Sequence, residues 1–545
     1  MTKRRILVTT ALPYANGEIH LGHLLEHIQT DIWVRFQRRQ GHECHYVCAD
    51  DAHGAAVMLK AEAEGVTPEE LIEQVHRNHE RDLRAFGVNY SNYYTTHSPE
   101  NRAYSEHIYH KLKEGGFIVT RTISQLYDPI RGLFLADRFV KGDCPRCNSP
   151  DQYGDSCEQC GSTYHATDLR NARSAFSGAV PELRETEHEF FDLPAFSDSL
   201  QDWHAAGSIQ PAVHNKLAEW FKEGLQAWDI TRDAPYFGFA IPGKPDKFFY
   251  VWLDAPVGYM ASFANYCNRR GGLNFDEFWK EPSDTELYHF IGKDIVYFHT
   301  LFWPAMLEGA GMRRPTGVFA HGFVSINGQK MSKSRGTFIT AARYLESLSP
   351  EYLRYYFAAR LNEGIDDIDL DLHDFVTRVN SDLGGKLVNI AARCARFINS
   401  YFNNQLAADL GRFGDLPAEQ RQAAGRVADH YEARQFARVI KLVMDMADSC
   451  NARIDACAPW KMIKDDAQRE QVKQLTSAML ESYWLMIGYL APVLPELFTN
   501  SCRLFGRTPE MCEGLAVAPL AGSTISPFTH LFKRLEQPQV DAMIS

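Results

Sequence analysis

The chain has 545 residues, a formal net charge of -12 at pH 7 and 45% hydrophobic residues. This length exceeds one hydrophobic core, so we expect about three or four domains. No apolar run approaches the roughly twenty residues of a membrane-spanning helix, and polar residues and a proline soon interrupt the apolar run near the amino terminus. We therefore expect a cytoplasmic protein whose 12 cysteines are thiols or metal ligands rather than disulfides. A nucleic-acid partner would need local basic faces, because the net charge repels it.

The amino-terminal pattern predicts a strand over residues 5–12, a turn over 14–17, a helix over 21–39 and a second strand over 44–49. Strand, helix and strand with short connections form a βαβ unit, whose right-handed crossover implies a parallel sheet. Ligands of such sheets bind beyond the carboxyl ends of the strands. We therefore expect a ligand site around residues 13–23 and 51–53.

Two histidines lie at the start of the predicted helix, in the sequence HLGH at residues 20–23. His20 and His23 are three residues apart and therefore share one face of the first turn. Gly22 leaves the backbone bare for a flat ring, and the positive helix terminus favours phosphate. The pattern favours a site for phosphate and a nucleobase. Structural or solvated histidines and a metal site remain alternatives.

A second helix is predicted over residues 66–86, with Thr67 as its N-cap. Beyond about residue 115 the pattern changes to short strands and turns. Here Cys144, Cys147, Cys157 and Cys160 form two CxxC pairs. This spacing is typical of a tetrahedral Cys₄ zinc site, and four thiolates would leave no open position, so we expect one structural zinc ion. Unmetallated thiols are the alternative.

An α/β pattern resumes at about residue 236. It predicts strands over residues 248–253 and 287–291, a helix through His299, and a last strand over 318–326. Gly292 and Asp294 follow the second of these strands and are suited to a ribose. The last strand leads to the sequence KMSKS at residues 330–334, whose lysines and hydroxyls are suited to phosphate, although a solvated loop is possible. The predicted fold is thus a Rossmann-like parallel sheet, split by an insertion over about 115–235.

The last two hundred or so residues are mostly helix-like. Residues 383–398 form an amphipathic pattern whose polar face includes Asn389 and Arg393, suited either to solvent or to nucleic-acid contacts. Trp460 follows Pro459 and is either a core residue or a stacking surface for an unpaired base. Residues 528–544 are also expected to be helical.

Together, HLGH, Gly292 with Asp294, and KMSKS resemble the two signatures of class I aminoacyl-tRNA synthetases, with Leu21 in place of the isoleucine of HIGH. Residues 11–17, 252–256 and 458–460 and the cysteine pairs narrow this resemblance to the bacterial-type methionyl-tRNA synthetase family. The resemblance covers essentially every domain. It implies a split Rossmann-like catalytic domain over 1–114 and 236–325, a zinc-binding connective insertion over 115–235, a KMSKS loop and stem-contact region over 326–384, and an α-helical anticodon-binding domain over 385–545.

The resemblance also implies an activity. L-methionine and ATP would give methionyl-adenylate and pyrophosphate, and the methionyl group would pass to the 3′ terminal adenosine of tRNA(Met), including the initiator tRNA. Mg²⁺ would accompany ATP, and catalysis would rest on positioning and charge stabilisation. The implied catalytic residues are His20, His23, Lys330 and Lys333. The implied ATP-binding residues are Tyr14, Asn16, Gly22, Gly292, Asp294, Val324 and Lys333.

The residues of the implied methionine pocket are Leu12, Tyr14, Asp51, Arg232, Trp252, Ala255, Pro256, Tyr259, Ile295 and His299. Aromatic and aliphatic walls suit a thioether, and a carboxylate suits the ammonium group. The implied anticodon contacts are Asn389, Arg393, Pro459 and Trp460. The chain shows no OB-like dimerisation module, so a monomer is expected. Another class I synthetase, a smaller nucleotidyltransferase or a non-enzymatic RNA-binding protein are the competing interpretations.

Overall fold

A five-stranded parallel sheet is formed by strands that lie between residues 5 and 321. The computed structural model describes residues 3–135, 139–154, 157, 159–160, 162, 164–331, 338–512, 514–515 and 517–544. The strand order is β15-β14-β1-β2-β3, and every neighbouring pair is parallel. The strands are β1 (Arg5–Thr10), β2 (Glu43–Asp50), β3 (Asn92–Thr95), β14 (Glu286–Gly292) and β15 (Gly317–His321). The predicted parallel sheet is confirmed, with strands from both sides of the insertion.

Helix α1 (Leu21–Arg39) connects β1 to β2 and completes the predicted βαβ unit. Its N-cap is His20, and Arg38 and Arg39 in its last turn complement the negative end of the helix dipole. Helix α3 (Pro68–Ala85) begins at the predicted N-cap, where Thr67 and Glu70 form a capping box. Both helices were predicted correctly because their signals are local in sequence.

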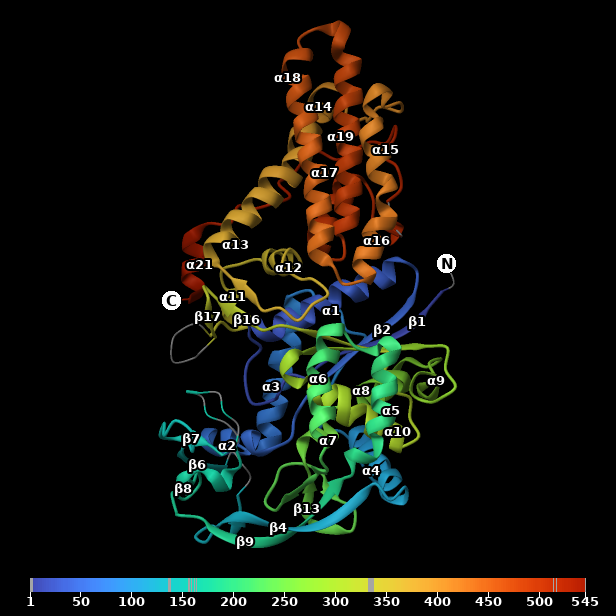
Figure 1. Cartoon of the computed structure of the whole chain (residues 1–545). Coiled ribbons are helices and arrows are strands. Elements are labelled where there is room, and N and C mark those ends of the chain that lie inside the picture. The colour runs from blue at the N-terminus through green and yellow to red at the C-terminus, as the bar shows by residue number, and fades with distance from the viewer. Residues whose placement is uncertain are drawn as a thin grey trace.

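The segment between β3 and β14 contains antiparallel sheets, in the lower part of Figure 1. The long strands β4 (Ile118–Asp128) and β9 (Glu182–Phe191) pair in one sheet with the order β10-β9-β4-β5, whose edge strands are β5 (Leu133–Phe134) and β10 (Trp228–Asp229). A smaller sheet contains β6 (Val140–Asp143), β7 (Gln152–Tyr153) and β8 (Arg170–Ser174). This sheet lies beside helix α2 (Ala55–Glu64), which packs against the same apolar cluster. The predicted insertion with a cysteine cluster is therefore present.

The prediction of a strand over residues 248–253 was correct only for Phe248 and Phe249 and wrong for the rest. Strand β13 (Lys244–Phe249) ends before Tyr250. It belongs to a separate antiparallel sheet, β11-β13-β12, with β11 (Thr231–Asp233) and β12 (Ala240–Ile241). Helix α7 (Val251–Asp254) follows at once, with the Ala255 N–H donating to the carbonyl of Val251. A short apolar run has no periodicity that separates a buried strand from a buried helix. Tertiary packing therefore decided the conformation of these residues.

The predicted single strand over 318–326 is broken at Gly322. Strand β15 ends at His321, and β16 (Val324–Ile326) pairs with β17 (Gln329–Lys330) and β18 (Ile368–Leu370) in another sheet. A Cβ atom on Gly322 would lie 2.1 Å from the carbonyl oxygen of Asp366, so the two backbones approach more closely than any other residue allows. This contact spans more than forty residues of sequence and has no local signal.

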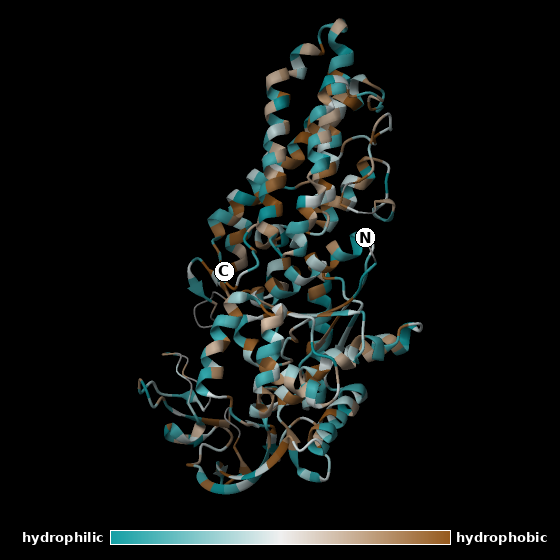
Figure 2. Ribbon diagram, turned by 45° about the vertical axis from the view of Figure 1, so that its right-hand side comes forward, coloured by the Kyte–Doolittle hydropathy of each residue, from teal (hydrophilic) through white to brown (hydrophobic). Residues whose placement is uncertain are grey.

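A bundle of helices forms the carboxyl-terminal part and projects from the sheet (Figure 1). Its helices include α14 (Asn389–Tyr401), α15 (Asp415–Gln422), α16 (Ala424–Glu432), α17 (Phe436–Cys457) and α19 (Arg469–Leu490). Figure 2 shows hydrophilic and hydrophobic residues alternating along these helices. The apolar face predicted for residues 383–398 is buried, as Leu387, Ile390 and Cys394 show. The predicted helical domain is thus confirmed in its fold class.

The prediction of a helix over residues 528–544 was only partly correct. Helix α21 covers Gln537–Ile544, and residues 528–536 run as irregular backbone. Phe528, Leu531 and Phe532 pack against the main hydrophobic core, and Tyr352 donates to the carbonyl of Lys533 at 2.7 Å. Side chains that anchor an extended segment on a distant surface can give an apolar spacing that resembles a helix.

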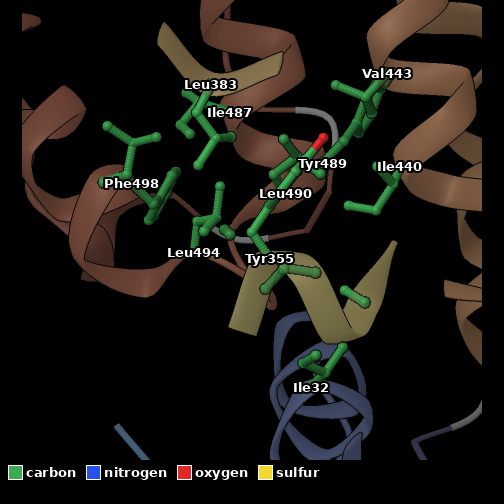
Figure 3. Close-up of a cluster of buried hydrophobic side chains, with 14 of the residues drawn as sticks. Ile32, Tyr355, Leu383, Ile440, Val443, Ile487, Tyr489, Leu490, Leu494 and Phe498 are labelled. Carbon is green, nitrogen blue, oxygen red and sulfur yellow. The ribbon is translucent and has the colours of Figure 1, made fainter. Parts of the chain in front are cut away.

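One hydrophobic core joins the sheet to the bundle. Figure 3 shows Ile32 of α1 below Tyr355 of α12 (Pro350–Ala358), with Leu490 and Leu494 above them. All four side chains belong to one buried cluster. The two halves of the chain are therefore packed together rather than linked by a loose connection. Among the described residues, none of the helices has the length and apolarity needed to cross a membrane.

The Arg354 side chain is buried at this junction and ties three segments together. Its guanidinium donates to Asp31 of α1 at 2.7 Å and to the carbonyl of Phe86 at 3.2 Å. It also donates to the carbonyls of Pro492 and Val493, at 3.0 and 2.8 Å. A buried charge needs such partners because burial removes it from water.

Candidate active site

A cavity of about 970 Å³ opens at the carboxyl ends of the parallel strands. It lies between the start of α1 and the β16–β17 hairpin, where the rule for α/β sheets places a ligand. Thirteen of the residues expected at the site line it: Leu12, Tyr14, His20, Gly22, His23, Asp51, Arg232, Trp252, Gly292, Asp294, Ile295, Val324 and Lys330. Its volume suits a nucleotide with a small second substrate.

Five other expected residues do not line this cavity: Asn16, Ala255, Pro256, Tyr259 and His299. Asn16 lies in the turn beside it, and the other four are buried. Lys333, together with the rest of the segment 332–337, lies outside the described residues.

The two signature histidines stack at the start of α1, with ring centroids 3.7 Å apart. His20 Nδ1 accepts from the Gly22 N–H at 3.1 Å, and His23 Nδ1 accepts from the His20 N–H at 3.3 Å. Each Nδ1 therefore carries no proton, so the neutral ring carries its proton on Nε2. Burial lowers the pKa of His23 well below its usual value, and neighbouring histidines lower it further. The pair thus presents neutral N–H donors at a positive helix terminus.

Two glycines in this wall leave room for neighbouring polar side chains. A Cβ on Gly22 would lie 2.9 Å from the ring of His20, and one on Gly292 would lie 2.5 Å from a carboxylate oxygen of Asp294. The Asp294 carboxylate therefore folds back over Gly292 at the end of β14. This arrangement gives a ligand both a close backbone and an adjacent acceptor for hydroxyl groups.

The KMSKS segment begins on a β-hairpin that faces the histidines. Asn327 and Gly328 have positive φ angles of 50° and 71°, as a type I′ turn between β16 and β17 requires. The Asn-Gly pair is a strong hairpin signal that sequence analysis did not use. Lys330 and Met331 line the cavity, and the Cε of Met331 would lie 3.1 Å from a Cβ on Gly22.

The chain returns to the histidines after the segment that the structure does not describe. Phe338 lies edge-on to His20, with ring centroids 5.0 Å apart. The Leu21 N–H donates to the carbonyl of Ile339, and the Ala341 N–H donates to the carbonyl of Ile19. The described residues on either side of the segment 332–337 therefore lie against the start of α1.

Aromatic and imidazole side chains form the wall beneath Trp252. Its indole stacks on Phe298 at a centroid distance of 4.0 Å. Behind it, Tyr259 Oη lies 2.7 Å from His299 Nε2, and His299 Nδ1 lies 3.1 Å from the carbonyl of Ile295. Since a carbonyl only accepts, His299 donates from Nδ1 and accepts at Nε2. Burial lowers the pKa of His299 to about 4, so the ring is neutral.

Asp51 provides a buried carboxylate at the cavity wall, 8% exposed. Its Oδ1 has no hydrogen-bond partner among the described residues. Burial raises the pKa of Asp51 well above its usual value, and the nearby charge of Asp254 raises it further. A buried carboxylate of this kind is stabilised by a cationic ligand. Arg232 lines the same cavity, with its guanidinium 3.9 Å above the ring of Tyr250.

Several cavity residues were missed by sequence analysis: Glu26, His27, Tyr236, His321, Phe323, Phe338 and Asp367. Glu26 follows His23 by one helical turn, so the i, i+3 rule could have found it. Its Oε1 has no partner among the described residues, and its Oε2 lies 3.4 Å from His321 Nε2. The others come from distant elements and have no local signal.

The four cysteines of the insertion lie together, with all four Sγ atoms within 4.8 Å of one another. The amides of Arg146 and Cys147 point at the Sγ of Cys144, at 3.4 and 3.5 Å, and the Cys160 N–H points at the Sγ of Cys157 at 3.4 Å. Such amides stabilise thiolates. The group could hold one metal ion with four thiolate ligands.

The four expected anticodon residues lie far from the cavity, in the bundle. Trp460 is 42% exposed, and the Arg393 guanidinium lies 5.2 Å from its ring centroid. Arg393 also pairs with Asp455 at 2.7 Å, and Asn389 lies 3.4 Å from Asn451. Pro459 begins the short helix α18 (Pro459–Met462) and is buried. The exposed indole excludes a core role for Trp460.

The comparisons with known proteins agree with this geometry. Residues 6–395 match the family model described as tRNA synthetases class I (M). A methionyl-tRNA synthetase from Mycobacterium tuberculosis in complex with methionyl-adenylate is 25% identical to the chain, with a TM-score of 0.79, and the match covers 97% of this chain and 100% of that one. A second structure of that enzyme, bound by methionyl-adenylate, is 24% identical with the same TM-score and coverage.

The split parallel sheet and the cavity with paired imidazoles at its helix terminus are those of a class I aminoacyl-tRNA synthetase. Within this class, the chain belongs to the methionyl-tRNA synthetase family.

Proposed function

We propose that the protein activates L-methionine with ATP to give methionyl-adenylate and pyrophosphate, and then transfers the methionyl group to the 3′ terminal adenosine of tRNA(Met), including the initiator tRNA. The observation that carries the proposal is the single cavity that brings together both phosphate-type signatures and an aromatic pocket with a buried carboxylate. The likeness to a structure that contains methionyl-adenylate supports it.

At the nucleotide end, the reaction needs charge stabilisation more than it needs a nucleophile from the protein. The carboxylate of methionine attacks the α-phosphate, and pyrophosphate leaves. Nε2–H groups of His20 and His23 would donate to phosphate oxygens, and Lys330 and Lys333 would draw charge from the leaving group. The adenosine would lie against Gly292, Asp294 and Val324, with Tyr14, Asn16 and Gly22 beside it.

At the methionine end, the Asp51 carboxylate would bind the ammonium group, assisted by Arg232. Leu12, Tyr14, Trp252 and Ile295 would form the wall around the side chain. Ala255, Pro256, Tyr259 and His299 lie behind that wall and would act by shaping it. One methylene changes binding by only about 1 to 3 kcal/mol, so we expect homocysteine to compete.

The metal ions have separate roles in this proposal. The four cysteines would bind one structural Zn²⁺, which would hold the turns of the insertion together. Mg²⁺ would arrive with ATP and neutralise its phosphates. Denaturing the protein in the presence of a chromophoric chelator should release about one zinc ion per chain, and the Cys147→Ser variant should release almost none.

In the bundle, Asn389, Arg393, Pro459 and Trp460 would contact the anticodon, with Trp460 as a stacking surface. We also propose the division into residues 1–114, 115–235, 236–325, 326–384 and 385–545, with tRNA contacting the last two parts. Because its substrates are ATP, methionine and tRNA, the protein would work in the cytoplasm.

The test is amino-acid-dependent exchange of pyrophosphate into ATP, measured with each of the common amino acids in turn. We expect stimulation by methionine and a weaker response to homocysteine. Stimulation by leucine would indicate another class I synthetase, and no stimulation would favour a non-enzymatic RNA-binding protein. Charging of tRNA(Met) from elongator and initiator transcripts then tests the second step.

A further inference from the structure

A buried polar cluster lies behind the cavity, around Asp50 at the end of β2. This carboxylate is 1% exposed. It accepts hydrogen bonds from His76 Nδ1 at 2.5 Å, from His79 Nδ1 at 2.7 Å and from the hydroxyl of Tyr93 at 2.5 Å. Burial raises the pKa of Asp50, but the hydrogen bonds from the two histidines outweigh it and hold the pKa below its usual value. The cluster therefore contains a stable buried anion.

His79 lies between two acceptors. Its Nδ1 faces the Asp50 carboxylate, and its Nε2 lies 2.7 Å from the carbonyl oxygen of Gly17. A carbonyl only accepts, and an ionised carboxylate only accepts, so both ring nitrogens must carry protons. Burial opposes this charge, but Asp50 and the Gly17 carbonyl raise the pKa of His79 above its usual value. The ring is therefore an imidazolium.

The titratable groups around His79 are compatible with a positive charge on its ring. Asp82, which lies on the same helix α3, favours the charged form of His79. On the side of α1 the neighbouring titratable groups are His23 and His27. Burial lowers the pKa of His27 to about 3, and the charge of His79 is the next largest cause. The charged ring thus helps to keep both α1 histidines neutral.

The hydrogen bond from His79 to Gly17 connects this cluster to the wall of the active-site cavity. Gly17 ends the turn that begins at Tyr14, whose side chain lines the cavity. The other end of the turn is fixed just beyond β2, because the Ala15 N–H donates to the carbonyl of Asp51 at 2.8 Å and Tyr14 forms a β-bridge with Asp51. Asp50 is the last residue of β2 and Asp51 continues its extended backbone, so their side chains point in opposite directions. Asp51 therefore faces the cavity, while Asp50 holds His79 against the turn.

We propose that His79 is a positioning residue, an imidazolium that fixes the turn over residues 14–17 against the end of β2 and so orders the ATP end of the cavity. This inference rests on the proposed function, because the turn is assigned to ATP there. His76 provides a matched control, since it shares the Asp50 carboxylate but the structure gives it no contact with the turn.

The kinetic test compares His79→Leu, His79→Gln and His76→Gln in methionine-dependent pyrophosphate exchange. We expect His79→Leu to raise the KM for ATP on the order of ten-fold, the usual scale for a lost hydrogen bond to a charged group. The KM for methionine should change less, because the turn contributes only Tyr14 to the methionine pocket. His79→Gln retains an N–H donor for the Gly17 carbonyl and should recover most of this loss. His76→Gln should stay within about two-fold of the parent protein.

Three results would overturn the proposal: an unchanged KM for ATP in His79→Leu, no recovery in His79→Gln, or equal damage in His76→Gln. The charge is tested separately by NMR of protein labelled with ¹⁵N-histidine. We expect a doubly protonated imidazole at a pH just above the usual histidine pKa that is lost in His79→Gln, and its absence would refute the imidazolium. If the parent protein shows no methionine-dependent exchange, the proposed function fails, while the NMR result still decides the charge.

Discussion

The cavity and the bundle surface around Trp460 use similar residue types in opposite environments. In the cavity, Asp51 is 8% exposed and the histidines are fixed by backbone amides. At the bundle surface, Trp460 is 42% exposed and Arg393 pairs with Asp455 in contact with water. The cavity holds its polar groups in place before a ligand arrives, whereas the bundle holds them through ion pairs that water weakens.

This difference matches the two kinds of partner that we propose. A small substrate is bound by many fixed contacts, so the site must be built in advance from strand ends and helix termini. RNA is bound through stacking and phosphate contacts at the surface, where a weak ion pair can exchange its carboxylate for a phosphate. The comparison predicts that changes in the two regions have separable effects.

The largest effect is expected at the junction that joins the two regions. Arg354→Met removes the guanidinium that pairs with the buried Asp31 and donates to three backbone carbonyls. We expect the free energy of unfolding to fall by about 3 to 5 kcal/mol. Urea unfolding followed by tryptophan fluorescence measures it. The exposed Arg396→Met is the control, with a change within about 0.5 kcal/mol. Equal stability of both variants would mean that the junction does not depend on Arg354.

The next effect tests the preorganised cavity. His23→Ala removes a neutral donor at the start of α1, and we expect methionine-dependent exchange to fall about 100-fold to 1,000-fold, as for the loss of one oxyanion donor. The rate of pyrophosphate exchange into ATP at saturating methionine measures this effect. His110→Asn, at an exposed position, is the control. A fall of less than about ten-fold would place His23 outside the phosphate contacts.

The third effect tests the exposed surface. Trp460→Ala should remove about 1 to 3 kcal/mol of stacking free energy and lower the rate of tRNA(Met) charging correspondingly. Pyrophosphate exchange should stay near its parent value. Trp460→Phe keeps an aromatic face and should recover much of the charging rate. Equal loss of exchange and charging would contradict the separation of the two regions.

The smallest expected effect is the pH dependence of the KM for methionine. Because the pKa of Asp51 is raised by burial and by Asp254, protonation of Asp51 competes with binding of the methionine ammonium. Below this raised pKa the KM for methionine should increase by up to about ten-fold for each pH unit of decrease, and above it the KM should level off. Exchange measured over a pH series tests this. A similar pH dependence in Asp51→Asn would show that another group is responsible.

The sequence by itself determined the features whose causes lie within a few residues. The limits of α1 and the capping box at Thr67 follow from local patterns. The placement of His20 and His23 on one face follows from their spacing, and the CxxC pairs could be recognised as a metal-binding pattern. The resemblance to a family then supplied roles that no local pattern contains.

Only the tertiary structure decided the features that depend on contacts between distant segments. Gly322 breaks the predicted last strand because the backbone at Asp366 crosses it. Asp254 raises the pKa of Asp51 from another part of the chain, and His79 reaches Gly17 across 62 residues. Trp460 is exposed because the bundle leaves it at the surface, not because of its own sequence. Burial and long-range contact set these properties, and neither has a local signal.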